Sequence, residues 1–151
     1  MNRKILIILS VIIGVYVMVK MKLSDLSIKA ISAISTMAAA IQSFEGWDPG
    51  SRSYRNNNPG NLRSKTLPTY LKGAIGLDDE KHVIFDTYEN GYNALIRQLK
   101  LAFTGKSNNF NPDMTLYQFF DKYAEANSGN YARAVAEKLG VSPETTLNEL
   151  S

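Results

Sequence analysis

Glu45 is the residue of this chain whose type and position best suit chemistry. Ile34 and Ile41 recur at the spacing of one helix face, and at about 100° per residue Glu45 falls within about 20° of the same direction. A carboxylate on a core-facing stripe loses solvation, and the last turn of a helix adds the negative end of the helix dipole. Both effects favour the neutral acid, which can protonate a leaving oxygen, as glycosidic cleavage requires.

The same spacing allows a simpler interpretation of Glu45. Helix ends are placed from sequence only to within a few residues, so Glu45 can also lie beyond the last turn, solvated or capping a loop. Spacing alone does not decide between the two. No second carboxylate stands at a spacing that identifies a catalytic partner. We expect the nearby acidic residues to face solvent, namely Asp48, Asp78, Asp79, Asp86 and Glu89.

Other kinds of catalytic centre have little support in the composition. The sequence has one histidine and no cysteine, so disulfides are excluded and a metal site is hard to build. His82 has no nucleophile or metal partner beside it in the sequence, and we expect it to be structural or exposed. The expectation is therefore a site with no metal and no cofactor.

A half-buried helix is expected to carry Glu45 near its end. Ser24 or Ser27 suits its N-cap, and the helix should stop near Gly46 to Pro49. Apolar side chains recur at steps of three and four along it, as one buried face requires: Ile31, Ile34, Ala38, Ile41 and Phe44.

The rest of the chain predicts a weak hairpin followed by helices. Residues 52–68 are rich in Asn, Ser, Gly and Pro and predict a loop, with short strands at 61–63 and 82–85. Helices are expected over 90–103, 115–123 and 130–139. The helix at 90–103 should turn four side chains inward, those of Ala94, Leu95, Leu99 and Ala102. Gly140 should end the helix at 130–139, and Pro143 should begin a last short helix.

Charge is unevenly distributed along the chain. The formal net charge is +3, yet Arg3, Lys4, Lys20 and Lys22 all precede the first acidic residue. Taking these four from 17 Lys and Arg leaves 13, against 14 Asp and Glu, so the remainder is slightly acidic. A nucleic-acid binder needs basic side chains gathered on its folded surface, and we expect no nucleic-acid partner.

The four cations bracket an uncharged apolar run at residues 5–19. As a helix this run rises about 22 Å, and Met21 and Leu23 bring it closer to the roughly 30 Å of a bilayer core. We expect a single-pass transmembrane helix within an anchor over 1–22, followed by one domain over 23–151. The alternatives are a cleaved signal peptide, although no small-residue cleavage site follows the run, and a buried core helix.

Four segments together resemble the phage-type members of the lysozyme-like superfamily, which includes lytic transglycosylases. They are AIQSFEGW followed by RNNNPGNLR, then VIFDTYENGYNAL, then KYAEANSGNYARAVAEKLGV. The Asn-rich string is specific, and the resemblance covers roughly 28–150. It implies a mainly α, lysozyme-like (α+β) domain with a small β-hairpin after the first helix.

The resemblance implies that Glu45 is the catalytic acid, because the glutamate ending the first long helix has that role in the superfamily. The implied substrate is the glycan strand of bacterial peptidoglycan, cut between MurNAc and GlcNAc. A single working glutamate favours a lytic transglycosylase with 1,6-anhydro products. Lysozyme-type hydrolysis and a non-catalytic peptidoglycan-binding virion protein are the alternatives. The chain lacks the Glu-Ser pair of soluble bacterial transglycosylases and the downstream Asp and Thr of many phage lysozymes.

Amide and aromatic side chains are expected to bind the substrate. The resemblance favours Asn58 and Asn61 as sugar contacts, with turn formation as the alternative. Tyr54, Tyr123 and Tyr131 can stack on sugar faces, with core packing as the alternative.

The expected setting is a bacteriophage enzyme that opens the cell wall during entry or lysis. It would be anchored in a virion membrane or in the bacterial inner membrane facing the periplasm. A cellular wall-remodelling enzyme is the near alternative. The expected partners are glycan strands and, through residues 5–19, a lipid membrane; the sequence indicates no oligomeric state.

Overall fold

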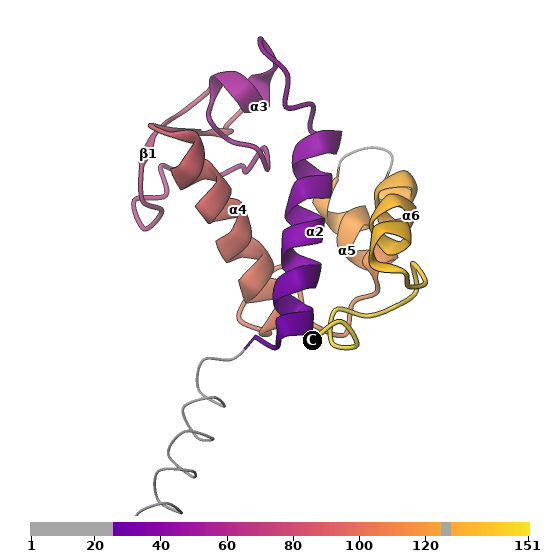
Figure 1. The fold of residues 1–151 in the computed structure, drawn as a ribbon. Coiled ribbons are helices and arrows are strands. Elements are labelled where there is room, and N and C mark those ends of the chain that lie inside the picture. Colours follow the sequence, from indigo (N-terminus) through magenta and orange to yellow (C-terminus); the bar gives the residue numbers. More distant parts are fainter. Residues whose placement is uncertain (1–25, 125–127) are drawn as a thin grey trace, which may run out of the picture.

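The computed structural model describes residues 26–124 and 128–151, which form five helices and one two-stranded sheet. Helix α2 runs through the middle of this part of the chain, with α4 on one side and the α5–α6 pair on the other (Figure 1). The elements are α2 (Ile28–Phe44), α3 (Arg52–Arg55), β1 (Ala74–Leu77), β2 (Val83–Phe85), α4 (Tyr88–Phe103), α5 (Leu116–Tyr123) and α6 (Ser128–Leu139).

Helix α2 begins where its capping residue predicts. The Ser27 side chain accepts a hydrogen bond of 3.0 Å from the Ala30 amide, which satisfies one of the free donors of the first turn. The helix ends at Phe44. Its buried face differs from the expected one, since Ile31 is 51% exposed. Four alanines take part in that face and let the neighbouring helices approach closely: Ala30, Ala33, Ala38 and Ala40 lie there with Ile34, Met37 and Ile41.

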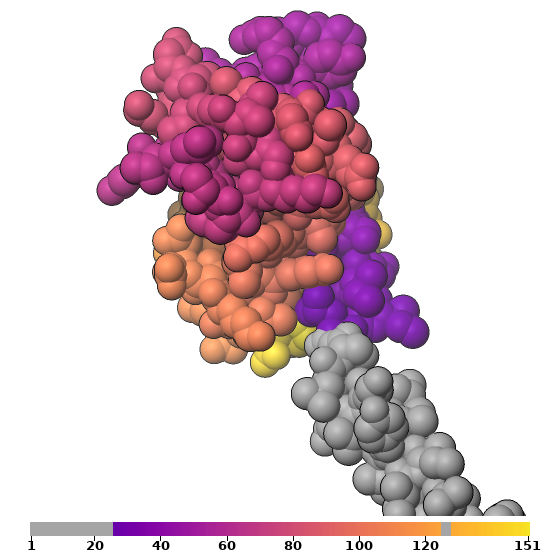
Figure 2. Space-filling model, turned by 90° about the vertical axis from the view of Figure 1, so that its left-hand side faces the viewer, coloured from indigo at the N-terminus to yellow at the C-terminus, as the bar shows by residue number. Residues whose placement is uncertain are grey.

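Of the two strands in the hairpin, only β2 was predicted from the sequence. β1 and β2 are antiparallel, with an irregularity between Ala74 and Gly76. The expected strand at 61–63 is wrong, because this segment contributes only an isolated bridge between Arg63 and His82. Figure 2 shows the hairpin and the loops before it, in magenta and pink, above the residues between α4 and α5, in orange.

The later helices follow their local signals closely. The expected inward face of α4 is confirmed, with Ala94, Leu95, Leu99 and Ala102 all buried. Gly140, with φ +67°, follows the last residue of α6 as expected. The short helix expected after Pro143 is wrong. The chain there makes turns that the backbone of α5 holds, since Leu116 donates to the Thr145 carbonyl at 3.0 Å.

The core has two parts. The larger lies where α2, α4, α5 and α6 meet, around Leu95, Leu99 and Phe120. The smaller lies under the hairpin and consists of Leu62, Val83, Phe85 and Ala94.

The predicted transmembrane helix requires a correction. None of the helices within 26–124 and 128–151 is long and apolar enough to cross a membrane. The apolar run at 5–19, which suggested an anchor over 1–22, lies outside the described residues. The described residues thus form helices and a small two-stranded sheet, without the single-pass anchor on which the expected membrane localisation depended.

Candidate active site

Glu45 lies in the wall of a cleft of about 660 Å³, a volume typical of ligand sites. The walls come from the end of α2, the segment before the hairpin, α4, and the α5–α6 pair. The described residues that line it are Phe44, Glu45, Arg52, Gly60, Asn61, Leu62, Arg63, His82, Gln98, Asn109, Phe110, Lys122, Tyr123, Ala124 and Tyr131.

The Glu45 carboxyl is held at both of its oxygens. Glu45 is the C-cap of α2 and half-buried. Its Oε1 accepts a hydrogen bond of 2.7 Å from the Tyr131 hydroxyl, and its Oε2 accepts one of 2.7 Å from the Asn61 amide. The two partners come from separate parts of the chain, Asn61 from the loop before the hairpin and Tyr131 from α6. Glu45 therefore lies at the helix end with a defined orientation, and is not a loosely solvated loop residue.

Asn61 combines an unusual backbone with an unusual side chain. Its φ is +45°, in the left-handed region that Asn tolerates better than most residues. Its Nδ2 donates to Glu45 while its Oδ1 is buried and has no hydrogen-bond partner among the residues that the structure describes. Asn61 lines the cleft and contacts the acid, and its contact with sugar stays a prediction.

The expected sugar contact at Asn58 is corrected by the structure. Asn58 is fully buried. Its Oδ1 accepts from the Leu62 amide at 2.9 Å, and its Nδ2 donates to the carbonyls of Leu62 and Val83 at 3.0 and 2.9 Å. Asn58 therefore ties the segment before the hairpin to β2 and does not reach the cleft.

The two predicted tyrosines near the acid do line the cleft, but their hydroxyls are used within the protein. The Tyr123 hydroxyl donates to the Gly60 carbonyl at 2.7 Å. Burial raises the pKa of Tyr123, and the Glu45 charge adds to this. Burial is the main cause that raises the pKa of Tyr131, and its hydrogen bond to Glu45 raises it further. Both hydroxyls therefore stay neutral and remain donors at ordinary pH.

Tyr54 is not brought into the cleft. It is 45% exposed and packs against Trp47, with ring centroids 5.2 Å apart. Trp47 also contacts Tyr88, at 4.9 Å. These rings form an aromatic cluster outside the described cleft lining, so the predicted substrate contact at Tyr54 is corrected to a packing contact.

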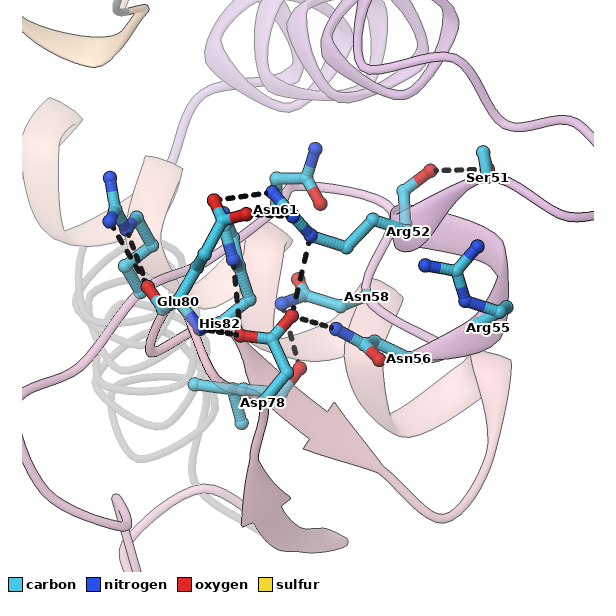
Figure 3. A network of polar contacts seen from close by, with 12 residues as sticks. Ser51, Arg52, Arg55, Asn56, Asn58, Asn61, Asp78, Glu80 and His82 are labelled. Carbon is cyan, nitrogen blue, oxygen red and sulfur yellow. Dashed lines mark hydrogen bonds and ion pairs between the residues drawn. The ribbon is translucent and has the colours of Figure 1, made fainter.

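Asp78 contacts two residues of the cleft lining, Arg52 and His82, and this role was not predicted from the sequence. Expected in solvent, its side chain is only 14% exposed. Its Oδ1 accepts from the amides of Glu80 and His82 at 3.0 and 2.8 Å, and its Oδ2 accepts from the Asn56 side chain at 2.9 Å. The Arg52 Nε lies 3.5 Å away. Figure 3 shows Asp78 at the centre of this network. An Asp that caps the amides two and four residues later is a turn signal that could have identified it.

Hydrogen bonding keeps Asp78 ionised. Burial alone would raise the pKa of this carboxyl, but the hydrogen bonds from the His82 amide and the Asn56 side chain, with the His82 ring, lower it to about 2. An unfolded Asp titrates near about 3.9. The folded carboxyl therefore binds its proton less readily than the unfolded one.

The lowered pKa predicts a loss of stability in acid. The ionised Asp78 carboxyl adds to the free energy of unfolding above about pH 4. This addition is lost as the pH falls towards about 2, because protonation then favours the unfolded chain. We expect a loss on the order of 1–2 kcal/mol in the unfolding free energy. Denaturant unfolding near pH 5 and pH 2.5 measures it, with Asp78→Asn as the reference. An equal acid loss in both proteins would contradict the assignment.

Comparisons with models of known protein families, with curated proteins and with solved structures find no match to this chain. Support for a function therefore comes from the residues of the cleft and their geometry. The resemblance to the lysozyme-like superfamily stays a prediction. Within the described residues, no group of three His, Asp or Glu side chains lies close enough to hold a metal ion.

Proposed function

We propose that this chain cuts the glycan strands of bacterial peptidoglycan between MurNAc and GlcNAc, with Glu45 as the proton donor. The observation that carries the proposal is the fixed carboxyl in the cleft wall, held by Tyr131 and Asn61 at 2.7 Å each. A carboxylate has about four lone-pair sites, and the two donors take one on each oxygen. The remaining sites are available for a proton and for substrate.

The cleft lining supports a sugar polymer as the substrate. Gln98 and Asn109 are amide residues of the cleft lining, and Phe44 is an aromatic residue of the lining that is 44% exposed. N-acetylated sugars present hydroxyl and amide groups at their edges and apolar C–H groups on their faces, and these two kinds of side chain complement them.

Transglycosylation is the reaction that this set of groups favours. Glu45 is the only carboxylate among the described residues that line the cleft, and ordinary hydrolysis uses a second one at a defined distance. Glu45 donates its proton to the glycosidic oxygen as the C1–O bond breaks. The resulting carboxylate then takes the proton of the C6 hydroxyl while the oxygen of that hydroxyl bonds to C1. This step closes a 1,6-anhydro ring and restores the acid.

Product analysis tests the proposal. Murein sacculi are digested with the full-length chain and the soluble fragments are analysed by mass spectrometry. We expect fragments with 1,6-anhydro ends. Fragments with reducing ends would show that the chain is a hydrolase, in which Glu45 can still be the acid. A lack of fragments from a folded protein would overturn the enzyme assignment.

Tyr131→Phe isolates the hydrogen bond to the acid. The variant keeps the ring that stacks on Phe44 with a centroid distance of 4.1 Å but removes the donor to Oε1. We expect the cleavage rate to fall by about 10- to 100-fold, as the loss of a hydrogen bond to a charged group predicts. Release of dye from labelled murein measures the rate. Tyr70→Phe, at a residue that is 71% exposed, is the control and should cut at the normal rate. An unchanged rate in Tyr131→Phe would show that this bond does not position the acid.

A further inference from the structure

His82 lies in the wall of the same cleft as Glu45 without a part in the proposed reaction. The residue is 6% exposed and lines the cleft. Its backbone is fixed by the bridge to Arg63 and by the bond of its amide to Asp78. The ring is therefore carried by the residue that directly precedes β2, where these bonds limit its freedom to move.

Asp78 determines which nitrogen of the ring carries the proton. Nδ1 of His82 lies 3.3 Å from Oδ1 of Asp78. Oδ1 of an ionised carboxylate can only accept, so the neutral imidazole must place its proton on Nδ1. Its lone pair is then on Nε2. Such a carboxylate–histidine pair fixes both the tautomer and the orientation of the ring.

Nε2 has no partner within the described protein. Across residues 26–124 and 128–151 no hydrogen bond to this atom is formed. The one side-chain polar atom in this part of the chain that is both buried and without a partner is Oδ1 of Asn61, so Nε2 is not among the buried atoms. Nε2 is therefore not sealed in the interior. Because His82 lines the cleft, this atom is accessible from the space that the substrate would fill.

The charged groups around the ring are already engaged with one another. The Arg52 guanidinium pairs with the Glu80 carboxylate and approaches Asp78, and Arg63 donates to the Glu80 carbonyl at 3.0 Å. Figure 3 shows Arg52 reaching across the network between Glu80 and Asp78. These contacts hold the wall in place around the His82 ring and leave its Nε2 as the ring atom that can meet a ligand.

We propose that Nε2 of His82 accepts a hydrogen bond from a hydroxyl or an amide N–H of the glycan, with Asp78 as the positioning residue that fixes the tautomer. The inference rests on the proposed function, because it takes an N-acetylated glycan as the ligand. The competing explanation is that His82 only secures the turn after β1 through its bond to Asp78.

Two substitutions of His82 separate these explanations. An asparagine amide reaches about as far as Nδ1, so His82→Asn keeps a donor to Asp78 and loses the atom in the cleft. A glutamine amide reaches about as far as Nε2, so His82→Gln keeps a polar atom in the cleft and loses the bond to Asp78. We expect KM for murein fragments to rise roughly tenfold in His82→Asn, with kcat little changed, and to rise less in His82→Gln. The reverse order, or equal effects, would overturn the proposal.

A direct measurement does not depend on how these variants fold. The sequence has one histidine, so the Glu45→Gln protein labelled uniformly with ¹⁵N gives one pair of imidazole ring signals beside the backbone amide signals. We expect a protonated Nδ1 and an unprotonated Nε2, and a shift of the Nε2 signal when a soluble disaccharide-peptide from murein is added. Amide signals of Asn61 and Tyr131 that shift while Nε2 does not would overturn this inference alone. If no signal shifts and the wild-type chain also leaves murein intact, the proposed function fails instead.

Discussion

Glu45→Gln is expected to abolish the cleavage of murein. General acid catalysis contributes about 10²- to 10⁴-fold to such reactions, and Glu45 also acts as the base in the second half of the proposed cycle. We therefore expect a loss of at least about a thousandfold. The amide is close in shape to the carboxyl and can still accept from the Tyr131 hydroxyl. The Asn61 amide can turn so that its Oδ1, which has no partner among residues 26–124 and 128–151, accepts from the new amide.

Because these contacts are retained, the loss should be one of chemistry and not of folding. Dye release from labelled murein measures the rate, and thermal unfolding should show nearly unchanged stability. Asp48→Asn is the matched control, since Asp48 is an exposed carboxylate close in sequence and outside the cleft. A Glu45→Gln protein that keeps a tenth or more of the wild-type rate would remove Glu45 from the mechanism.

Gly91→Ala is expected to be the most destabilising single-methyl change in the region around the site. A Cβ at Gly91 would lie 1.8 Å from the carbonyl oxygen of Asn57 and 3.1 Å from the Phe85 ring. The first contact is with backbone, so no side-chain rotation relieves it. Asn57 has a φ of +49°, and its loop has little freedom to shift. We expect a loss of at least about 3 kcal/mol of unfolding free energy, at the upper end of overpacking effects.

Urea unfolding of the purified variants measures this cost. Gly76→Ala is the control, because a Cβ there would meet Ile84 at an ordinary 3.6 Å. The loop that Gly91 supports leads to Asn61, so Gly91→Ala should also lower the rate of cleavage. A Gly91→Ala protein within about 1 kcal/mol of the wild type would show that α4 packs less closely on this loop than the structure indicates.

The helices were predictable from sequence because their signals are local. The Thr115 and Gln118 side chains form a capping box at the start of α5, and Gly140 ends α6. The first strand of the hairpin was not predictable in this way. Residues 74–77 are short and irregular and do not alternate between buried and exposed. The segment chosen in their place contains Asn61, whose left-handed backbone does not continue a strand.

The candidate site was predictable only in part. Helical periodicity places Glu45 at the end of α2, and the structure confirms that location. Tyr131 and Asn61 were predicted to contact the sugar, and the structure adds a hydrogen bond from each of them to the acid. Their role depends on how distant segments pack, which no local pattern records. Asp78 was expected to face solvent, and His82 to be structural or exposed. Hydrogen bonds within the turn between β1 and β2 shield both side chains from solvent, and residue type alone does not predict such bonds.

The partners of Glu45 stand far apart along the chain, with Asn61 16 residues away and Tyr131 86 residues away. Contacts between near neighbours form early in folding, and those across long loops form late. During synthesis on the ribosome, α2 and the hairpin emerge well before α6. The nascent chain consequently carries Glu45 without Tyr131 until residue 131 has been made, and a cell that makes the protein holds a complete site only after α6 has docked.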